Sequence, residues 1–436
     1  MTSERQSNLD EMVTLVQTGR MKRRAFLERA LALGLSGSVA ASFLAACGGG
    51  SSSSTGTTSS GPVTLTLWDY FNDAGNGYLG LISNYTKANP SIKIQRTTIP
   101  FADLKQKIIQ GAASRQLPDI VVIDNPDHSA FSAQGILADL TDRINSWGQA
   151  DQYFPGPWKS TTWKGKNYGV PNNSNCLALY YNKDMFQKAG LKPPTTWDEL
   201  HNAASKLTKS GTYGLSMSLV KSEEGTFQYL PFLWEAGADL NTIDSPAAVS
   251  SLQFLVTLVK EKSLSAESLN WTQQDAITQF VAQKAAMCIN GPWNLPTTQK
   301  GAKFAWGVVP LPKGQQAASI LGGENWAIPA TSSHIDEAWK FIRWTQETAQ
   351  LKSYIVADDR LPSNKQFAAD SAFHKDPNLA VFTDALEVAR PRAYGPNYPK
   401  VSNAVQQAFQ EAVTGQMSAQ AALQQAGQTI KPLLTS

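Results

Sequence analysis

Acidic and amide side chains stand where predicted strands end, a position from which they could bind a ligand. Asp69 and Asn72 follow the first predicted strand, and Asp124 and Asn125 follow the third. Ligands of α/β sheets bind beyond the carboxyl ends of the strands. Carboxylates accept two hydrogen bonds at once, and amides both donate and accept, so this set suits a ligand rich in hydroxyl groups. Helix capping is the alternative role for Asp69 and Asp124.

The elements that should position these residues alternate between strands and helices. This order predicts a parallel sheet covered on both faces. The third strand, Ile120-Val121-Val122-Ile123, is apolar throughout, which is typical of a strand buried on both sides. The five elements are expected at residues 63–68, 77–89, 92–98, 101–113 and 120–123.

A second group of elements follows in the middle of the chain. We expect a strand at 177–182 and then a short helix at 183–191, whose end is marked by Gly190. Thr196 and Glu199 have the spacing of a capping box, in which each side chain bonds the other residue's backbone N–H, and they predict the start of the next helix.

Cys47 closes an N-terminal segment with the composition of an export signal. The basic run Lys22-Arg23-Arg24 precedes residues 30–46, which carry no charge. This stretch is shorter than the roughly 20 apolar residues of a membrane-spanning helix. With Leu44-Ala45-Ala46-Cys47 as its cleavage motif, the segment resembles a bacterial lipoprotein signal. The alternative is an N-terminal anchor helix that happens to end in cysteine.

The resemblance implies a protein that is exported and held by a lipid at the outer face of the cell membrane. Residues 1–46 should be removed as the signal peptide, and Cys47 should carry the lipid on its sulfur. Residues 47–61 are rich in Gly, Ser and Thr and are expected to form a flexible tether. The run from Lys22 to Leu27 also resembles a twin-arginine export motif, although Lys22 replaces the usual Ser or Thr. The alternative is the basic region of a general secretory signal.

Charge and composition exclude several classes of function. The chain has 38 Lys and Arg against 35 Asp and Glu; six of the former and four of the latter precede Cys47, so the remainder is nearly neutral. A nucleic-acid binder needs a basic excess. The four histidines are widely spaced, and no metal-binding pair, phosphate loop or nucleophile elbow occurs. We therefore expect no cofactor, no metal and no nucleic-acid partner. Cys176 and Cys288 either pair or are two buried apolar residues.

Runs spread along the chain resemble the family 1 extracellular solute-binding proteins. These are the carbohydrate-capturing proteins of ABC importers, of which the maltose-binding protein is the best known. The resemblance spans residues 63–432 and rests on the order and spacing of the runs, since none is diagnostic alone. The runs are Val170-Pro171, Leu179-Tyr180-Tyr181-Asn182-Lys183-Asp184, Lys188-Ala189-Gly190-Leu191, Pro194-Thr195-Thr196-Trp197-Asp198-Glu199-Leu200, Ala285-Ala286-Met287, Gly291-Pro292-Trp293, Trp306-Gly307-Val308-Val309-Pro310-Leu311-Pro312, Gly322-Gly323-Glu324-Asn325-Trp326-Ala327-Ile328, Ala338-Trp339-Lys340-Phe341-Ile342 and Leu361-Pro362-Ser363.

The fold implied by the resemblance is a two-lobed α/β fold of the periplasmic-binding-protein kind, with the ligand between lobes that are joined by chain crossings. The first lobe is expected to comprise residues 62–173 and 312–347, and the second lobe residues 174–311 and 348–436. The crossings are expected near residues 173–178, near residues 308–311 and near Thr348.

Strand-end position and the resemblance together indicate which residues contact the ligand. An aromatic ring can cover the C–H face of a sugar, and Trp293 matches the family's aromatic platform. Gly322 and Gly323 would let the backbone approach a ligand closely. The expected ligand contacts are Trp68, Asp69, Asn72, Asp124, Asn125, Asn172, Asn173, Trp234, Trp293, Gly322, Gly323, Glu324, Trp326 and Arg360.

Several of these contacts have an alternative structural role. Core packing is the alternative for Trp234 and Trp293, a turn position for Asn172, and an exposed surface charge for Glu324. Asp69, Asp124 and Glu324 also supply the carboxylates that a glycoside hydrolase would need.

The resemblance implies a non-catalytic, monomeric receptor that binds a sugar or oligosaccharide and delivers it to the permease subunits of an ABC importer. A surface-tethered glycoside hydrolase is the alternative from another class. A third interpretation keeps the receptor fold with a polyamine or glycerol phosphate as its ligand. Clustered arginines would favour the phosphate, and several carboxylates between aromatic rings would favour the polyamine.

Overall fold

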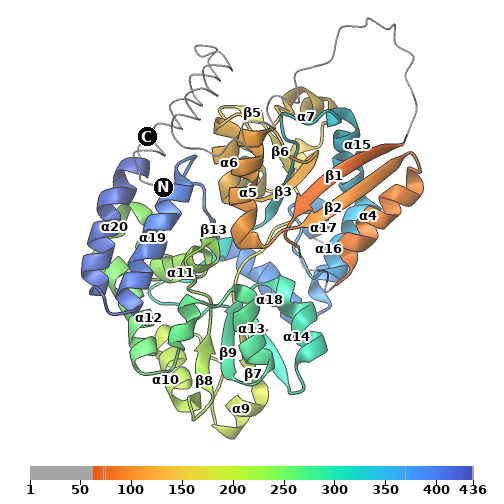
Figure 1. Ribbon diagram of the computed structural model, residues 1–436. Helices are drawn as coiled ribbons and strands as arrows, with labels where there is room; N and C mark the ends of the chain where they lie inside the picture. Colours follow the sequence, from red (N-terminus) through yellow and green to blue (C-terminus); the bar gives the residue numbers. More distant parts are fainter. Residues whose placement is uncertain (1–61, 72, 74, 369, 435–436) are drawn as a thin grey trace, which may run out of the picture. The chain divides into compact units, whose positions relative to one another are not determined.

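Two β-sheets organise the part of the chain that the computed structural model describes, which is residues 62–71, 73, 75–368 and 370–434 (Figure 1). The expected signal peptide, Cys47, the tether and Asn72 lie outside the described residues. Residues 61–436 form one compact unit. Among the described residues, no helix combines the length and apolar character needed to cross a membrane.

The first sheet has five strands. Their order is β2 (Ile92–Thr98), β1 (Val63–Asp69), β3 (Ile120–Asp124), β12 (Glu324–Ala327) and β6 (Gly169–Pro171). Strand β1 runs parallel to β2 and β3, whereas β12 runs antiparallel to β3 and β6. The sheet is therefore mixed, and the expectation of a parallel sheet is correct only for its first three strands. The late strand β12 enters from a part of the chain that local alternation does not reveal.

The second sheet has four strands. Their order is β10 (Trp306–Val309), β7 (Ala178–Asn182), β9 (Ala285–Asn290) and β8 (Tyr213–Ser216). Only β8 and β9 are parallel. All six residues of β9 are buried, because helices pack against this sheet.

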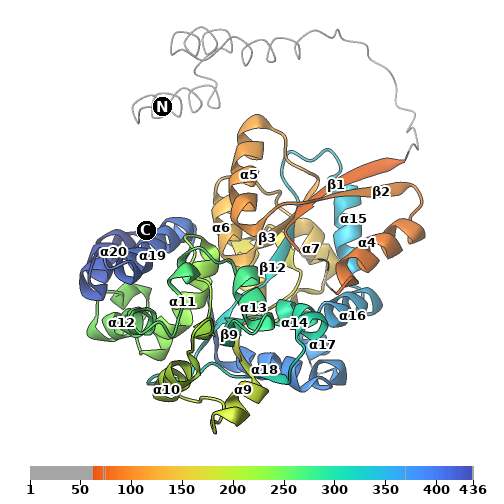
Figure 2. The same ribbon diagram turned by 60° about the horizontal axis from the view of Figure 1, so that its bottom comes forward.

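Helices surround both sheets (Figure 2). Those that pack around the first sheet are α4 (Gly77–Ala88), α5 (Phe101–Ser114), α6 (Asn125–Ala133), α7 (Thr141–Trp147), α8 (Pro155–Ser160), α15 (Ile335–Thr345) and α16 (Thr348–Ala357). Those that pack around the second are α9 (Lys183–Lys188), α10 (Trp197–Leu207), α11 (Glu223–Glu235), α12 (Pro246–Lys260), α13 (Gln273–Val281), α14 (Leu295–Gly301), α18 (Pro377–Ala385), α19 (Tyr398–Val413) and α20 (Ala419–Leu434). Helix α17 (Lys365–Ala368) lies between α16 and α18 in the sequence.

Two local expectations differ from the structure. Thr196 caps α10 by accepting a hydrogen bond from the N–H of Glu199 at 3.3 Å, but the Glu199 carboxylate bonds Thr195 rather than the Thr196 backbone. Only half of the predicted capping box therefore forms. Cys176 and Cys288 are both buried and unpaired, which decides between the two roles that the sequence left open.

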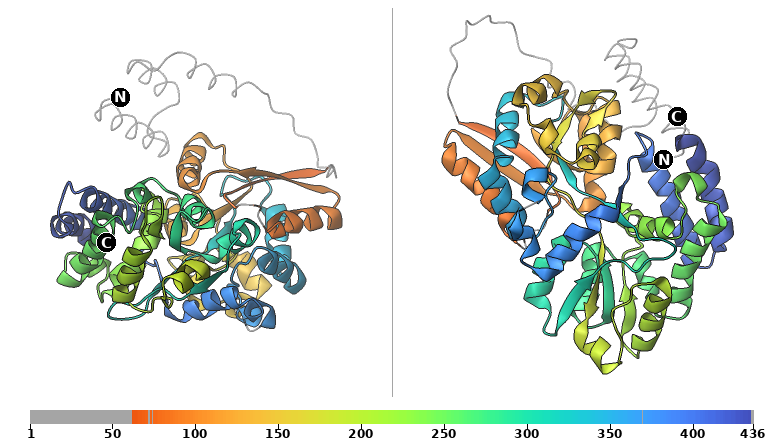
Figure 3. Two further views of the ribbon diagram at one scale, coloured as in Figure 1. Left: turned by 90° about the horizontal axis from the view of Figure 1, so that it is seen from below. Right: turned by 180° about the vertical axis from the view of Figure 1, so that it is seen from behind.

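Three segments connect the two halves and lie side by side (Figure 3, right). Ser174 and Leu361 exchange backbone hydrogen bonds of 2.7 and 3.2 Å. Asn175 and Gly322 exchange bonds of 3.2 and 2.9 Å. The segment around Ser174 is therefore the central one of the three. The second crossing lies at Gly322 and not near residues 308–311, because Trp306–Val309 is a strand of the second sheet and Lys313 pairs with Thr196. The third crossing lies at Leu361 and not near Thr348, because α16 packs on α4 beside the first sheet.

Two glycines allow this close approach of the crossings. Gly323 has φ +134°, and a Cβ there would meet the Asn173 carbonyl oxygen at 2.2 Å. A Cβ on Gly322 would meet Asn175 Oδ1 at 2.0 Å. L side chains rarely adopt such a φ, so glycine is required at position 323. These glycines were expected to approach a ligand, whereas the groups that they approach belong to the neighbouring crossing.

Candidate functional site: a polar and aromatic cleft

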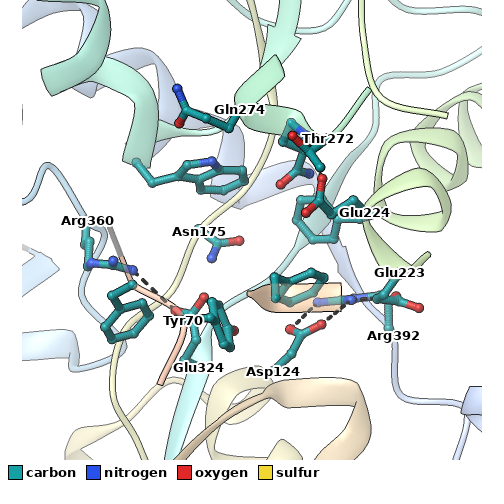
Figure 4. A pocket seen from close by; sticks show the side chains of 15 residues that line it. Tyr70, Asp124, Asn175, Glu223, Glu224, Thr272, Gln274, Glu324, Arg360 and Arg392 are labelled. Atoms are coloured by element: carbon teal, nitrogen blue, oxygen red, sulfur yellow. Dashed lines mark hydrogen bonds and ion pairs between the residues drawn. The ribbon is translucent and has the colours of Figure 1, made fainter. Parts of the chain in front are cut away.

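A cavity of about 300 Å³ lies between the two halves (Figure 4). Both halves contribute side chains to it, and the crossings contribute others. The lining residues are Tyr70, Phe71, Phe101, Asp124, Asn175, Glu223, Glu224, Phe227, Thr272, Gln273, Gln274, Trp293, Glu324, Arg360 and Arg392. Among the described residues, no group of three or more His, Cys, Asp or Glu side chains is arranged to hold a metal.

The first sheet supplies its carboxylates at one edge. Strand β3 ends at Asp124, and the antiparallel β12 begins directly beside it at Glu324. Tyr70 and Phe71 follow the end of β1 at the same edge. The antiparallel direction of β12 thus brings a residue from late in the chain beside the carboxyl ends of β1 and β3.

Glu324 is held on two sides but retains binding capacity. The Tyr70 hydroxyl donates a 3.1 Å hydrogen bond to its Oε1, and Arg360 lies 3.6 Å from its Oε2. Burial raises the pKa of Glu324. Glu324 Oε2 and Arg360 Nε are buried, and neither has a hydrogen-bond partner among the described residues. A buried polar atom without a partner costs free energy, which a ligand hydroxyl could recover.

Arg392 links the two halves at the floor of the cleft. Its guanidinium donates two bonds of 2.9 Å to Asp124, one of 2.7 Å to Glu223 and one of 3.1 Å to Asn125. Glu223, the first residue of α11, also accepts a hydrogen bond from Tyr398 at 2.6 Å. The Arg392 side chain is only 1% exposed. Arg392 therefore pairs with two of the four carboxylates that line the cavity and offsets one of their two negative charges.

Glu224 is the lining carboxylate that no cation contacts. It lies at the start of α11 and accepts a 2.6 Å hydrogen bond from the backbone N–H of Gln273, at the start of α13. Burial raises its pKa to about 7. Helix N-termini favour negative charge, so the two helices partly offset the cost of ionising Glu224.

Trp293 forms the aromatic wall that the second half contributes. It follows β9, is partly exposed, and lies 6.2 Å from Phe227 between ring centroids. A Cβ on Gly291 would come within 1.9 Å of the indole, so glycine at position 291 leaves room for the ring. Asn175 extends from the central crossing toward the same space.

The cavity brings together four of the expected contacts, Asp124, Trp293, Glu324 and Arg360. Asn125 contacts Arg392 behind them. Asn172 and Asn173 are buried in the central crossing, where Asn172 accepts a 2.8 Å bond from the Tyr354 hydroxyl and a 3.0 Å bond from the Asn173 amide.

Four other expected contacts do not line the cavity. Asp69 is fully buried and paired with Arg96 at 2.6 Å. Trp68 packs against the cluster between α5 and β3. Trp234 and Trp326 are fully buried in the two hydrophobic cores. The aromatic type of Trp234 and Trp326 indicated a ligand, but the helix and the strand that carry them direct their rings into the protein.

Several lining residues were absent from the expected set. Glu223 and Glu224 follow the helix cap Ser222, and Gln273 and Gln274 follow the cap Thr272. Caps predict helix starts, but they do not show that two such starts face one cleft. Arg392 follows the short strand β13 (Ala389–Pro391), and no local sequence pattern indicated its role.

Comparison with known proteins gives one consistent result. A family profile described as bacterial extracellular solute-binding protein matches residues 80–381. The chain is 28% identical to the lactose-binding protein of Rhizobium radiobacter over 304 residues, which cover 65% of this chain and 70% of that protein.

Solved structures agree with this match. An ABC transporter solute-binding protein of Thermotoga lettingae bound with α-D-tagatose superimposes with a TM-score of 0.80 at 26% identity, covering 85% of this chain and 99% of that one. The GacH receptor of Streptomyces glaucescens, determined unliganded and with acarbose, gives a TM-score of 0.78 at 26% identity, covering 86% and 98%.

Proposed function

Because this chain belongs to the bacterial extracellular solute-binding proteins, we propose that it captures a sugar or oligosaccharide between two lobes and delivers it to the permease of an ABC importer. The first lobe is the half around the five-stranded sheet, and the second lobe is the half around the four-stranded sheet. The protein acts as a monomeric receptor. Relatives that bind lactose, tagatose or acarbose support a carbohydrate as the ligand class.

The observation that carries this proposal is the pairing of Trp293 with Glu324 across one cavity. Trp293 presents an aromatic face from the second lobe, and Glu324 presents a buried carboxylate oxygen without a hydrogen-bond partner from the first. A sugar has an apolar C–H face for the ring and hydroxyls for the oxygen. One sugar ring between the two residues meets both requirements.

Charge pairing favours a neutral ligand over a polyamine or a phosphate ester. Asp124 and Glu223 share the single positive charge of Arg392, and Glu324 faces Arg360. Both arginines are thereby engaged, so a phosphate would have to displace a carboxylate. A polyamine would find Glu224 as its one carboxylate without a cationic partner among the lining residues.

We further propose that the bound sugar is not cleaved. A glycoside hydrolase needs one carboxyl group that donates a proton and a second that acts as base or nucleophile. Asp124 receives two hydrogen bonds from Arg392 and is held away from both roles. The relatives reported above are binding proteins.

Isothermal titration calorimetry on the purified protein tests this function. The panel contains mono-, di- and trisaccharides of glucose, mannose, galactose and arabinose, with spermidine and glycerol 3-phosphate as the competing classes. We expect saturable binding of at least one sugar and none of the other two classes. Binding of only spermidine or glycerol 3-phosphate would overturn the carbohydrate proposal.

Membership in this extracellular family implies export, and we propose a lipid on Cys47 as the anchor. The sequence motif Leu44-Ala45-Ala46-Cys47 and the following tether support this arrangement. Intact-mass analysis of protein extracted from membranes of the native host should give a chain that starts at Cys47 and carries acyl groups. An unmodified chain that starts at Met1 would contradict the proposal.

The lobe boundaries are also a proposal. We assign residues 62–173 to the first lobe, as the sequence suggests. The second lobe extends from residue 174 to about residue 321 rather than to residue 311, because Lys313 pairs with Thr196 and Ile320 lies in the core of that lobe. Because α16 packs on α4, we extend the late part of the first lobe from residue 347 to about residue 360. Residues 377–434 belong with the second lobe, since α18 contacts β7 and β10.

A further inference from the structure

A second cavity, of about 210 Å³, adjoins the one described above. We call it the outer compartment, and the cavity beneath Trp293 the inner compartment. Tyr70, Phe101, Asp124 and Glu223 line both, so the two compartments share a wall. Helices α5 and α6 of the first lobe form one side of the outer compartment, and residues from α11 and α19 of the second lobe form the other.

The shared wall is aromatic and firmly held. The rings of Tyr70 and Phe101 meet edge to face with centroids 4.9 Å apart. Asp124 and Glu223 are fixed by the same guanidinium, that of Arg392. Sugar rings in the two compartments would therefore contact the same aromatic wall from its two sides.

The outer compartment also offers hydrogen-bonding groups from both lobes. Lys105 of the first lobe lines the compartment, and its ammonium group lies 2.8 Å from Asp127, which also lines it. From the second lobe, Gln406 donates through Nε2 to Ser402 at 2.8 Å, while no described group donates to its Oε1. Asn403 is exposed, and its side chain has no hydrogen-bond partner among the described residues. Such groups suit the hydroxyls of a second sugar unit.

We propose that the ligand is a linear saccharide of at least two units. One ring lies beneath Trp293 in the inner compartment, and the next lies over Phe101 in the outer compartment, within reach of Lys105 and Asn403. This inference rests on the proposed carbohydrate function and adds a minimum chain length to it. Since both lobes line each compartment, each sugar unit is enclosed from both sides.

Calorimetry with one homologous sugar series tests the inference. The series is the one that binds in the panel above, taken as monomer, dimer and trimer. We expect the dimer to bind at least about tenfold more tightly than the monomer, since bonds to a charged group add to the stacking on Phe101. Asn403→Ala and Lys105→Met should each lose a large part of this gain while the monomer still binds.

Matched variants separate the possible outcomes. Lys107→Met is the control for Lys105, because Lys107 lies two residues further along α5 and does not line the compartment. Lys105→Met could lower stability, because it leaves Asp127 unpaired. Asn403 is exposed, so Asn403→Ala tests the contact with the second sugar unit without that effect. Equal affinity for monomer and dimer would overturn the inference and leave the carbohydrate proposal standing. A gain that neither variant reduces would place the second unit elsewhere and also overturn it. Binding of no sugar at all would overturn the proposed function itself.

Discussion

Trp293 and Trp234 show that one residue type serves two purposes in this chain. Trp293 lines the cavity, whereas Trp234 is fully buried and donates a 3.2 Å hydrogen bond to Asp239. We expect Trp293→Ala to weaken sugar binding by about 1 kcal/mol or more, which is at least about fivefold in Kd, without lowering apo stability greatly.

Trp234→Ala is the matched control. It should cost about 3–5 kcal/mol of unfolding free energy, because it leaves a cavity in the core. Calorimetry and urea denaturation measure the two effects separately. If Trp293→Ala destabilised the apo protein as much as Trp234→Ala, its main role would be core packing.

Glu224 should make stability depend on pH. Burial raises its pKa from the ordinary 4.5 to about 7 in the folded protein. The stabilisation linked to this shift is complete below the unfolded pKa, near 4.5, and is lost as pH rises through about 7. Glu224→Gln stays neutral and should keep this stabilisation at every pH. Between pH 5 and pH 8, the free energy of unfolding of the wild type should therefore decrease relative to that of the variant, by up to about 3 kcal/mol.

Urea denaturation across this pH range measures the difference. Glu387→Gln changes an exposed glutamate and serves as the control that should follow the wild-type profile. Parallel profiles for the wild type and Glu224→Gln would show that Glu224 remains ionised in the fold at little cost.

At the scale of elements, Arg392 holds together pieces that the sequence places far apart. It joins the end of β3 to the start of α11. We expect Arg392→Met to cost about 3–5 kcal/mol, because Asp124 and Glu223 would remain buried without their cation. Arg390→Met should cost less than about 1 kcal/mol, since the Arg390–Asp239 pair is 40% and 29% exposed.

Chemical denaturation compares these two arginine variants. Adding Asp124→Asn and Glu223→Gln to Arg392→Met should recover part of the loss, because the uncompensated charges would then be gone. Equal losses for Arg392→Met and Arg390→Met would mean that the buried cluster adds no net stability.

The crossings give a second prediction at this scale. Gly323→Ala should destabilise the protein by more than about 1 kcal/mol, because φ +134° is strained for alanine and its Cβ would meet the Asn173 carbonyl. Gly80→Ala in α4 is the control. No atom lies within 4 Å of its Cβ position, and helix propensity should make this change neutral or stabilising by up to about 1 kcal/mol. Equal melting temperatures for Gly323→Ala and Gly80→Ala would contradict the predicted backbone strain at position 323.

The sequence predicted elements better than it predicted the cleft. The expected strand at 92–98 and the helix starting at Phe101 match β2 and α5, because alternation and helical periodicity are local properties. Asp124 was expected because it follows a predicted strand, and Glu324 because it follows Gly322-Gly323 in a run that resembles the family. Trp326 was expected at the ligand, but it stacks with Tyr78 in the core, since the direction of a side chain depends on the register of β12 in its sheet. Arg392 could not be predicted, because its three acidic and amide partners lie more than 160 residues away.

At the scale of the whole molecule, three adjacent crossings join two lobes that both line the ligand cleft. Few residues separate the lobes there, so a rotation can be absorbed near Ser174, Gly322 and Leu361. Hinge closure of this kind is the established behaviour of periplasmic binding proteins. The cluster around Arg392 adds a contact between the lobes at the cleft floor, which should restrict the directions of rotation.

We therefore expect lobe closure on sugar binding and no turnover. A ligand that contacts both Trp293 and Glu324 binds the closed state better than the open state and must shift the population toward it. Small-angle scattering should give a smaller radius of gyration with sugar than without, and Trp293→Ala should need more sugar to reach the same change. Chromatography should recover the sugar unaltered after long incubation. If the sugar were instead cleaved at a rate proportional to protein, and Glu324→Gln or Asp124→Asn abolished the cleavage, the receptor function would be wrong and the carboxylates of this cleft would be those of a hydrolase.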